Sequence, residues 1–346
     1  MINVIITGIG GGGIGEQILK ALKISSLDLK LFGTDTTNLS KNIFEVKKMF
    51  IIRPAYSIGY CTELLNICLK NNINVIFPGS EPELKVISNN RELFEKNNIF
   101  LPINPKDVID ICLDKVKTVE FLKANGFNFP RSVYVREEKD LDKVDFYPAV
   151  LKPSIGGSGS SNIMLAQTKD EVIVFGNYLL TLYDKFIIQE YIGVPEHEYT
   201  VGVLMSMNGE NINSIGLKRI ITHGLGNKIN VKNRTKRADL GDVLVISSGI
   251  SQGEIGKFPE ITKICVDVAK RIGAKSSINI QCRFFEDKVY VFEINPRYSG
   301  TTFFRAMAGY NEQEILLKNY FLGTDYNVDE QFENCTILRG LCETKI

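Results

Sequence analysis

Apolar and polar positions alternate along the first 100 residues in a way that predicts strands separated by helices. Short runs rich in β-branched residues lie at residues 3–7, 29–33 and 73–78. Between them, apolar residues recur at helical spacing, as with Ile14, Ile18 and Leu22. Strands that alternate with helices indicate a parallel sheet with right-handed crossovers. We expect a fourth strand near Ile99–Pro102 to close this first domain.

The pattern changes twice further along the chain. One helix is predicted from about Pro105 to Asn125, because proline suits the first turn and Gly126 stops the helix. Residues 127–185 predict a small α/β segment, and from Phe186 the strands read as mostly antiparallel. Two helices interrupt this last part, at about residues 261–272 and 312–322. The fold class is therefore α/β, with an α+β C-terminal part.

Composition is that of an ordinary globular protein and argues against several functions. The 346 residues are 44% hydrophobic and 23% charged with a net charge of +1, so no global field favours nucleic acid or a membrane. No apolar run reaches about 20 residues, and no secretory signal follows Met1. Seven scattered cysteines without a Cys-x-x-Cys pair favour a reducing cytoplasm. With only His197 and His223, a histidine-rich zinc site and a Ser-His-Asp triad are disfavoured.

The apolar run at residues 289–297 ends in side chains suited to a metal. Glu293 and Asn295 lie two apart in a predicted strand, so both point to one face, and Arg297 follows at the turn. Gln281, in the partner strand of a predicted hairpin, can add a third oxygen. Oxygen ligands beside a fixed cation suit Mg²⁺ that bridges phosphate groups. An ordinary strand with a polar end is the alternative, which the Glu-x-Asn pair alone would favour.

A glycine-rich loop, Gly8–Gly15, follows the first strand and opens a helix. It satisfies Gly-x-Gly-x-x-Gly in two registers, and Asp35 ends the second strand where a dinucleotide fold has its ribose-binding acid. An NAD-dependent enzyme is one interpretation. The glycines could also serve only a tight turn, or offer N–H groups to another anion. The chain continues with further phosphate-binding features rather than a hydride-handling site.

Those features begin with Lys115, in the helix before the small segment, and Lys152, at the end of a strand. The residues that follow, Gly156–Ser161, are rich in N–H and hydroxyl donors and contain no acid. Such a loop can fold over phosphates without steric conflict. Solvated lysines and a plain linker are the alternatives.

A strand at Ile187–Ile192 ends in polar and aromatic residues that can offer backbone groups to an adenine edge. Glu198 follows where it can accept from ribose hydroxyls. Seven cations without an acid lie between Asn211 and Ala238, namely Lys218, Arg219, Lys228, Lys232, Arg234, Lys236 and Arg237. Nucleic acid is one interpretation, but interleaved aromatics are missing. We expect part of this segment to form an anion-facing wall and the rest a solvated face.

The order of these motifs resembles the ATP-grasp superfamily, and most closely the branch with the carbamoyl-phosphate synthetase large chain and similar carboxylate–amine ligases. The motifs, specific only jointly, are DK at 114–115, LKPSIGGSGSS at 151–161, IIQEYI at 187–192, EYTV at 198–201, INIQ at 278–281 and FEINPR at 292–297. The resemblance implies a Rossmann-like pre-ATP-grasp domain followed by an ATP-grasp fold of two lobes. The predicted divisions are 1–104 for the first domain, 105–185 for a linker helix and small lid lobe, 186–323 for the large lobe with the metal site, and 324–346 for a tail.

The resemblance also implies residue roles, with ATP between the lobes and one or two Mg²⁺ ions, Mn²⁺ being an alternative. The implied nucleotide-binding residues are Lys115, Lys152, Gly156, Gly157, Ser158, Gly159, Gln189, Glu190, Tyr191, Ile192 and Glu198. The implied metal ligands are Gln281, Glu293 and Asn295. Arg297 would be catalytic, stabilising the transferred phosphoryl group or an acyl-phosphate.

The implied reaction joins a small carboxylate to an amine. The carboxylate attacks the γ-phosphate of ATP, and the amine then displaces phosphate from the acyl-phosphate. Glu81 or Glu83, after the third strand, can meet the ammonium group of an amino-acid-like substrate; the alternative is that they complement a helix dipole. No nucleic acid or membrane partner is expected, and a homodimer is implied by resemblance alone.

Three other functions remain open. Carboxyphosphate chemistry like that of the synthetase is doubtful, because this chain has one grasp unit where the synthetase has two. An NAD-dependent oxidoreductase would use Gly8–Gly15 and be indifferent to Glu293. A non-catalytic ATP-binding regulator would bind ATP without releasing phosphate.

Overall fold

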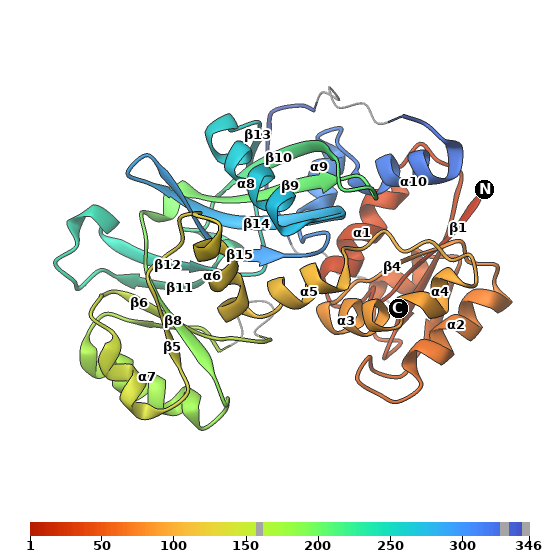
Figure 1. The fold of residues 1–346 in the computed structure, drawn as a ribbon. Coiled ribbons are helices and arrows are strands. Elements are labelled where there is room, and N and C mark those ends of the chain that lie inside the picture. Colours follow the sequence, from red (N-terminus) through yellow and green to blue (C-terminus); the bar gives the residue numbers. More distant parts are fainter. Residues whose placement is uncertain (157–161, 326–331, 341–346) are drawn as a thin grey trace.

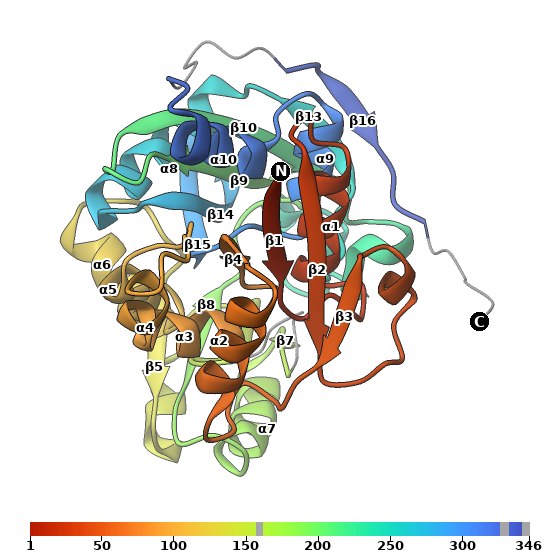
Figure 2. The same ribbon diagram turned by 90° about the vertical axis from the view of Figure 1, so that its right-hand side faces the viewer.

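The computed structural model describes residues 1–156, 162–325 and 332–340 (Figure 1). The N-terminal part is a parallel four-stranded sheet in the order β3-β2-β1-β4. Its strands are β1 (Ile2–Ile6), β2 (Leu29–Asp35), β3 (Lys48–Ile51) and β4 (Val75–Phe77). The helices of this part are α1 (Ile14–Lys23), α2 (Tyr60–Lys70), α3 (Glu81–Asn89) and α4 (Arg91–Glu95). Figure 2 shows the sheet with β1 and β2 at its centre.

The fourth strand is not the predicted one. Near Ile99–Pro102 the chain forms a single parallel bridge, between Phe100 and Val75. The fourth strand is instead β3, which lies at the sheet edge beside β2. Every residue of β3 is at least partly exposed, so no buried run marks this strand in the sequence.

The single helix predicted from Pro105 to Asn125 is also wrong, because two helices occupy this stretch. They are α5 (Lys106–Cys112) and α6 (Lys115–Ala124). Asp114 separates them: its backbone is extended, and its carboxylate accepts the Val116 N–H at 3.0 Å as the cap of α6. The hydroxyl of Ser154 donates to the same carboxylate at 2.6 Å. The break makes Lys115 the first residue of α6.

The next part, residues 132–190, is here called the small lobe. It contains an antiparallel sheet in the order β5-β8-β6-β7 and helix α7 (Lys169–Leu180), and it lies at the lower left of Figure 1. The strands are β5 (Ser132–Val135), β6 (Ala149–Pro153), β7 (Met164–Ala166) and β8 (Phe186–Glu190). Strand β8 lies beyond residue 185, where the small lobe was predicted to end, and it pairs with β5 and β6 of this lobe. The small lobe has a hydrophobic core of its own.

The remaining residues build a six-stranded antiparallel sheet in the order β15-β14-β9-β10-β13-β16. Its strands are β9 (Glu198–Met205), β10 (Asn211–Arg219), β13 (Gly253–Gly256), β14 (Ser276–Phe285), β15 (Lys288–Asn295) and β16 (Cys335–Ile337). A two-stranded sheet, β11 (Asn227–Lys232) with β12 (Val243–Ser247), lies alongside. The helices are α8 (Pro259–Ile272), α9 (Thr302–Met307) and α10 (Glu312–Leu322).

The N-terminal sheet and the large sheet share one hydrophobic core. Ile6 and Leu19 from the first part pack in the same cluster as Leu204, Phe304 and Leu316. Helix α1 lies between its own sheet and helices α9 and α10 in Figure 1. The α/β class with an antiparallel C-terminal part is confirmed. Within the described ranges no helix is long and apolar enough to cross a membrane.

Substitution of Gly79, which follows β4, tests how closely the loop after β4 packs against the loop after β1. A β-carbon at this position would lie 1.9 Å from the Thr7 carbonyl oxygen and 2.7 Å from the Gly15 α-carbon. Neither backbone can yield cheaply, so we expect Gly79→Ala to lower the free energy of unfolding by about 3 kcal/mol. Urea unfolding measures the loss. Gly340→Ala, where nothing lies within 4 Å, is the control and should change stability by less than about 0.5 kcal/mol; equal effects would contradict the packing.

Candidate active site

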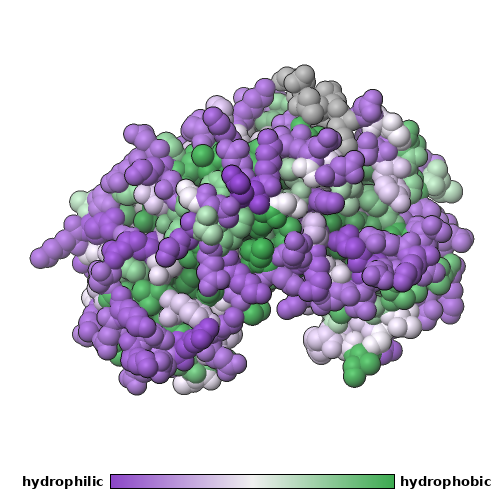
Figure 3. All heavy atoms as spheres, in the orientation of Figure 1, coloured by the Kyte–Doolittle hydropathy of each residue, from purple (hydrophilic) through white to green (hydrophobic). Residues whose placement is uncertain are grey.

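A cavity of about 510 Å³ lies where the three parts of the chain meet. Its walls come from the glycine-rich loop, the start of α3, the small lobe and the open face of the large sheet. In Figure 3 the surface is hollowed between the small lobe and the N-terminal part. Chain segments far apart in sequence therefore present side chains to one enclosed volume.

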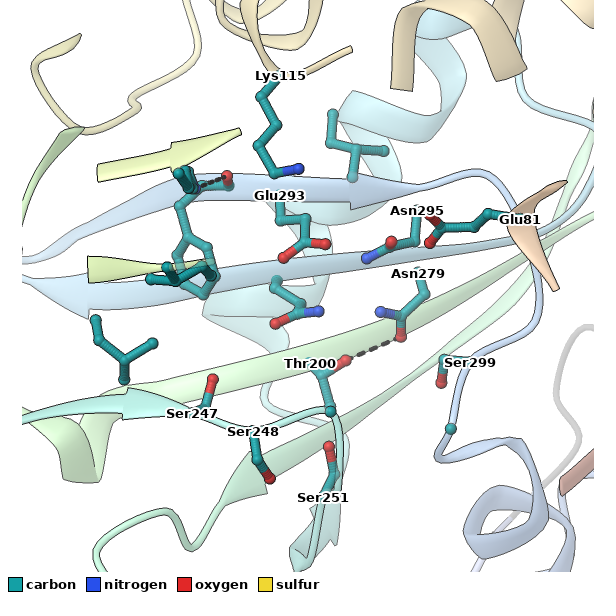
Figure 4. Close-up of a pocket in the computed structure, with 18 of the residues that line it drawn as sticks. Glu81, Lys115, Thr200, Ser247, Ser248, Ser251, Asn279, Glu293, Asn295 and Ser299 are labelled. Atoms are coloured by element: carbon teal, nitrogen blue, oxygen red, sulfur yellow. Dashed lines mark hydrogen bonds between the residues drawn. The ribbon is translucent and has the colours of Figure 1, made fainter. Parts of the chain in front are cut away.

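The large sheet supplies the polar floor of the cavity, because its strands alternate. The register places Gln281 opposite both Glu293 and Thr200, and Asn279 opposite Asn295. All five residues line the cavity, and Figure 4 shows Glu293 and Asn295 next to each other on β15. Residues between them in the strands, Val201, Ile280 and Ile294, face the core under α8. The structure thus brings together the three predicted metal ligands.

One extra residue interrupts the alternation in β15. Gln281 pairs with Glu293 but Cys282 pairs with Val291, so Phe292 has no counterpart in β14. Such a bulge re-aims the side chains that follow it. The Phe292 carbonyl accepts a hydrogen bond from Lys152 Nζ at 3.3 Å, and the ammonium lies 5.7 Å from the Phe292 ring. The bulge thereby connects β15, the strand with the predicted metal ligands, to strand β6 of the small lobe.

Lys152 and Lys115 bring positive charge to this edge of the cavity. Lys152 is 5% exposed, and no carboxylate among the described residues forms an ion pair with it. Burial lowers its pKa to about 8; the Glu293 charge opposes the change and the Lys115 charge adds to it. Lys115 Nζ donates to the Gly156 carbonyl at 3.1 Å, and Figure 4 shows it directed toward Glu293. Two cations that form no ion pair with a described carboxylate favour an anionic ligand.

Arg297 is held by a residue of the N-terminal part. Its Nη2 donates to Glu81 Oε1 at 2.7 Å and to Asn295 Oδ1 at 3.0 Å. Glu81 is the first residue of α3, so this ion pair joins two domains at the cavity wall. Glu83 instead is buried, with hydrogen bonds from Ser80 and Tyr60, and burial raises its pKa. Of the two candidate ammonium partners, only Glu81 lines the cavity.

Glu198 lies at the cavity floor with both carboxylate oxygens in ion pairs. Arg219 Nη1 lies 2.8 Å from one oxygen and Arg283 Nη2 lies 3.0 Å from the other, and all three residues are buried. Burial alone would raise the pKa of Glu198, but the two guanidinium groups lower it overall. Arg219 also donates to Gln281 Oε1 at 3.3 Å. The contact of Glu198 with ribose stays a prediction. Its carboxylate already forms ion pairs with Arg219 and Arg283.

The predicted adenine segment lines the cavity at the end of β8. Its side chains have protein partners: Gln189 donates to Ser132 at 3.0 Å, and Glu190 pairs with Arg237 at 3.1 Å. The Tyr191 hydroxyl accepts the Val245 N–H at 2.9 Å. The wall residues of this segment are Gln189, Glu190, Tyr191 and Ile192. These contacts fix the side chains, so an adenine edge would meet backbone groups. Their roles stay predictions.

The predicted phosphate loop is described only at its start. Gly156 lines the cavity. Gly157, Ser158 and Gly159 lie outside the described residues.

The glycine-rich loop lines the cavity from the N-terminal side, at Gly8, Gly10, Gly12 and Gly13. Asp35 Oδ2 accepts the Gly10 N–H at 2.7 Å, and a β-carbon on Gly10 would lie 2.6 Å from that oxygen. Asp35 therefore holds the loop in place. Asp35, whose position suggested a contact with ribose, thus already accepts a hydrogen bond from the protein backbone.

Several cavity residues were not predicted. Hydroxyl groups gather on one wall, and Figure 4 labels Ser247, Ser248, Ser251 and Ser299 there. Arg339, from the tail, also lines the cavity. Arg219 was noted only as one of seven cations. These residues come from loops or strand ends without a periodic pattern, so only the fold identifies them.

Comparisons with known proteins give the family. A family model described as "ATP-grasp domain" matches residues 112–301, and one described as "PylC-like, N-terminal domain" matches residues 4–101. The first model covers more than half of the chain, so the chain belongs to the ATP-grasp family. The family predicted from the sequence motifs is confirmed.

Relatives and solved structures agree with this assignment. The chain is 23% identical over 281 residues to the carbamoyl phosphate synthase large chain of Thermoplasma volcanium, covering 76% of this chain and 24% of that protein. It therefore spans about a quarter of the length of that relative. The biotin carboxylase domain of Hydrogenobacter thermophilus 2-oxoglutarate carboxylase, solved with MgADP and bicarbonate, superimposes with a TM-score of 0.64 at 16% identity, covering 92% of this chain and 69% of that one. The L-amino acid ligase of Bacillus licheniformis gives 0.63 at 16% identity, covering 92% and 74%. At these identities the structures show the shared fold.

The buried charge of Lys152 predicts a pH-dependent stability. Below pH 8 the lysine is charged in both states, and the folded state bears the cost of burying that charge. Between pH 8 and 10.5 the unfolded chain keeps the proton and the folded protein loses it, so the cost diminishes as pH rises. We expect Lys152→Met to raise the free energy of unfolding at pH 7 by on the order of 1–3 kcal/mol. Urea unfolding at pH 7 and pH 9.5 should show a smaller difference at the higher pH; a constant difference would contradict the assignment.

Proposed function

We propose that the protein is an ATP-dependent carboxylate–amine ligase that forms an amide bond through an acyl-phosphate. The observation that supports this most directly is the charge arrangement at β15. Two lysines that form no ion pair among the described residues, Lys115 and Lys152, lie near Glu293, which would hold a cation. A metal–nucleotide complex would neutralise both groups, because its phosphates carry several negative charges for the lysines and its divalent ion can bind Glu293.

The oxygens of β15 fit Mg²⁺. Glu293 and Asn295 present a carboxylate and an amide on one face, the hard oxygen donors that this ion prefers. The amide nitrogen of Asn295 is buried without a hydrogen-bond partner among the described residues, so turning the amide toward a cation gives up only the bond that its oxygen accepts from Arg297. Gln281 shares its oxygen with Arg219 and is the weaker candidate. A bound Mg²⁺ ion would neutralise phosphate charge during transfer. We propose that one or two ions bind here and that Mn²⁺ can substitute, and metal titration tests both points.

The protein residues would mainly position the reactants. Lys115 and Lys152 would hold phosphate oxygens, and Arg297 would stabilise the charge that develops on the transferred group. The substrate carboxylate would attack the terminal phosphate, and the amine would then displace phosphate from the acyl group. No protein nucleophile is required. Movement of the small lobe over the cavity would exclude water from the acyl-phosphate.

An amino-acid-like substrate fits best. Glu81 faces the cavity beside Asn295 and can accept an ammonium group in exchange for its bond to Arg297. The similarity in fold to an L-amino acid ligase agrees with this choice. Carboxyphosphate chemistry, as the name of the Thermoplasma relative suggests, is the second candidate.

We also propose a cytoplasmic setting and a dimeric assembly for the enzyme. The cysteines in the described ranges are free, which suits a reducing cytoplasm. A homodimer is proposed because the related biotin carboxylase domain was solved as a dimer.

Calorimetric titration with MgATP, and with NAD⁺ in parallel, tests the nucleotide site. We expect MgATP to bind, Glu293→Gln to weaken metal-dependent binding about tenfold or more, and NAD⁺ not to bind. Arg297→Ala should still bind MgATP but release phosphate about 100 to 1,000 times more slowly in an amino-acid mixture.

Glu254→Gln is the control, because this residue is an exposed glutamate in β13 of the same sheet and should behave as wild type. Binding of NAD⁺ alone would favour an oxidoreductase. Binding of MgATP without phosphate release in any substrate mixture would favour a regulator. Either outcome would overturn the ligase.

A further inference from the structure

The C-terminal tail delivers an arginine to the cavity, although the sequence assigns the tail no element. Strand β16 pairs with β13, at the edge of the large sheet, and two residues later Arg339 reaches the cavity wall. Its guanidinium lies 4.5 Å from the Phe304 ring, measured from the guanidinium carbon. Nη2 donates to Gly300 O at 2.7 Å and to Gln17 Oε1 at 3.0 Å. These contacts fix the plane of the group and leave the Nε and Nη1 donors without a partner among the described residues.

Arg339 differs in charge balance from the other arginines of the cavity. Arg219 and Arg283 pair with Glu198, and Arg297 pairs with Glu81. No carboxylate of the described ranges forms an ion pair with Arg339. The nearby Glu16 is 2.6 Å from Lys20 and is already neutralised. A half-buried cation beside a cavity, without a counter-ion, is costly unless a ligand supplies one.

This cation lies away from the lysine edge of the cavity. Its backbone N–H donates to Gln252, which follows Ser251, and its side chain binds Gly300, which follows Ser299. Figure 4 shows Ser251 and Ser299 on the far side of Glu293 and Asn295 from Lys115. The cavity therefore has positive charge at two separate places. Only one of them is needed for the phosphates of a nucleotide.

We propose that Arg339 binds a substrate carboxylate that does not react, so that one of the two substrates is an amino acid held by its α-carboxylate. The proposal rests on the proposed ligase function and specifies its substrate class. Gly300 is three residues beyond Arg297, which limits the separation of these two α-carbons to about 10 Å. Arg339 and the Arg297–Glu81 pair thus contact one short segment of the cavity wall, so an amino acid with its carboxylate at Arg339 would direct its amine along this segment toward Glu81 and the reacting centre. The Ser251 and Ser299 side of the cavity adds hydroxyl groups to this subsite.

A merely structural role makes a different prediction. If Arg339 only fastened the tail to α1, removing its partner Gln17 would have the same effect as removing the guanidinium. If it binds substrate, the charge matters and the hydrogen bond to Gln17 matters little. The two roles can be distinguished by replacing the carboxylate of the substrate with a neutral carboxamide.

The experiment compares each of the twenty L-amino acids with its α-carboxamide as a probe of ADP formation at saturating MgATP. The wild type should prefer the acid of its substrate over the amide by roughly 10- to 100-fold in kcat/KM, the range of a charged hydrogen-bonded contact. Arg339→Gln should reduce this preference to less than about threefold without changing the Kd for MgATP. Arg339→Lys, which keeps the charge, should retain part of the preference.

Two control variants and the binding data keep the outcomes distinct. Gln17→Leu and Leu338→Ala, the latter at an exposed neighbour, should keep the preference of the wild type. A wild type without acid-over-amide preference would overturn the subsite, as would an unchanged preference in Arg339→Gln or a loss in Gln17→Leu equal to that in Arg339→Gln. If MgATP binds and depends on Glu293 in those cases, the nucleotide site stands. If MgATP does not bind, the proposed function itself fails.

Discussion

The bulge at Phe292 sets the phase of the side chains on the cavity side of the large sheet. On its N-terminal side, Val289 and Val291 face the core; on its C-terminal side, Ile294 faces the core and Glu293 and Asn295 face the cavity. Without the extra residue, Glu293 and Asn295 would continue the alternation of Val289 and Val291 and would therefore face the core instead of the cavity. The apolar core face of β15, the polar groups that Glu293 and Asn295 present to the cavity and the carbonyl that receives Lys152 all depend on this single irregularity.

The charges around the cavity are arranged at a cost to stability. Glu198 and its two arginines are buried but mutually paired, which limits the cost. Lys152 is buried without such a partner, and its lowered pKa shows that the fold disfavours its charge. The shared core of the N-terminal and large sheets supports these groups, whereas the small lobe has a separate core. The cavity thus lies between a base with a shared core and a lobe whose main core is its own.

Patterns of period two and short motifs predicted the class of fold, the family and the strand that holds Glu293 and Asn295 and is followed by Arg297. They could not predict what depends on contacts distant in sequence. The helix break at Asp114 requires Ser154, and the engagement of Glu198 requires Arg219 and Arg283. The edge strand β3 and the tail strand β16 are short and largely exposed, so neither has a buried run to mark it. Arg339 was missed for the same reason, because its position depends on how β16 pairs with β13.

The route of the chain through the small lobe has a consequence for how the protein folds. The chain enters this lobe by β5 and leaves it by β8, and these two strands are hydrogen-bonded neighbours, with the Glu190 N–H donating to Arg131 O. Once the lobe has formed from its own local contacts, the ends of the intervening segment are already together. The N-terminal part and the large-sheet part then meet as if that segment were a short turn, and the loop entropy of a long insertion no longer opposes the packing of α1 against α9 and α10.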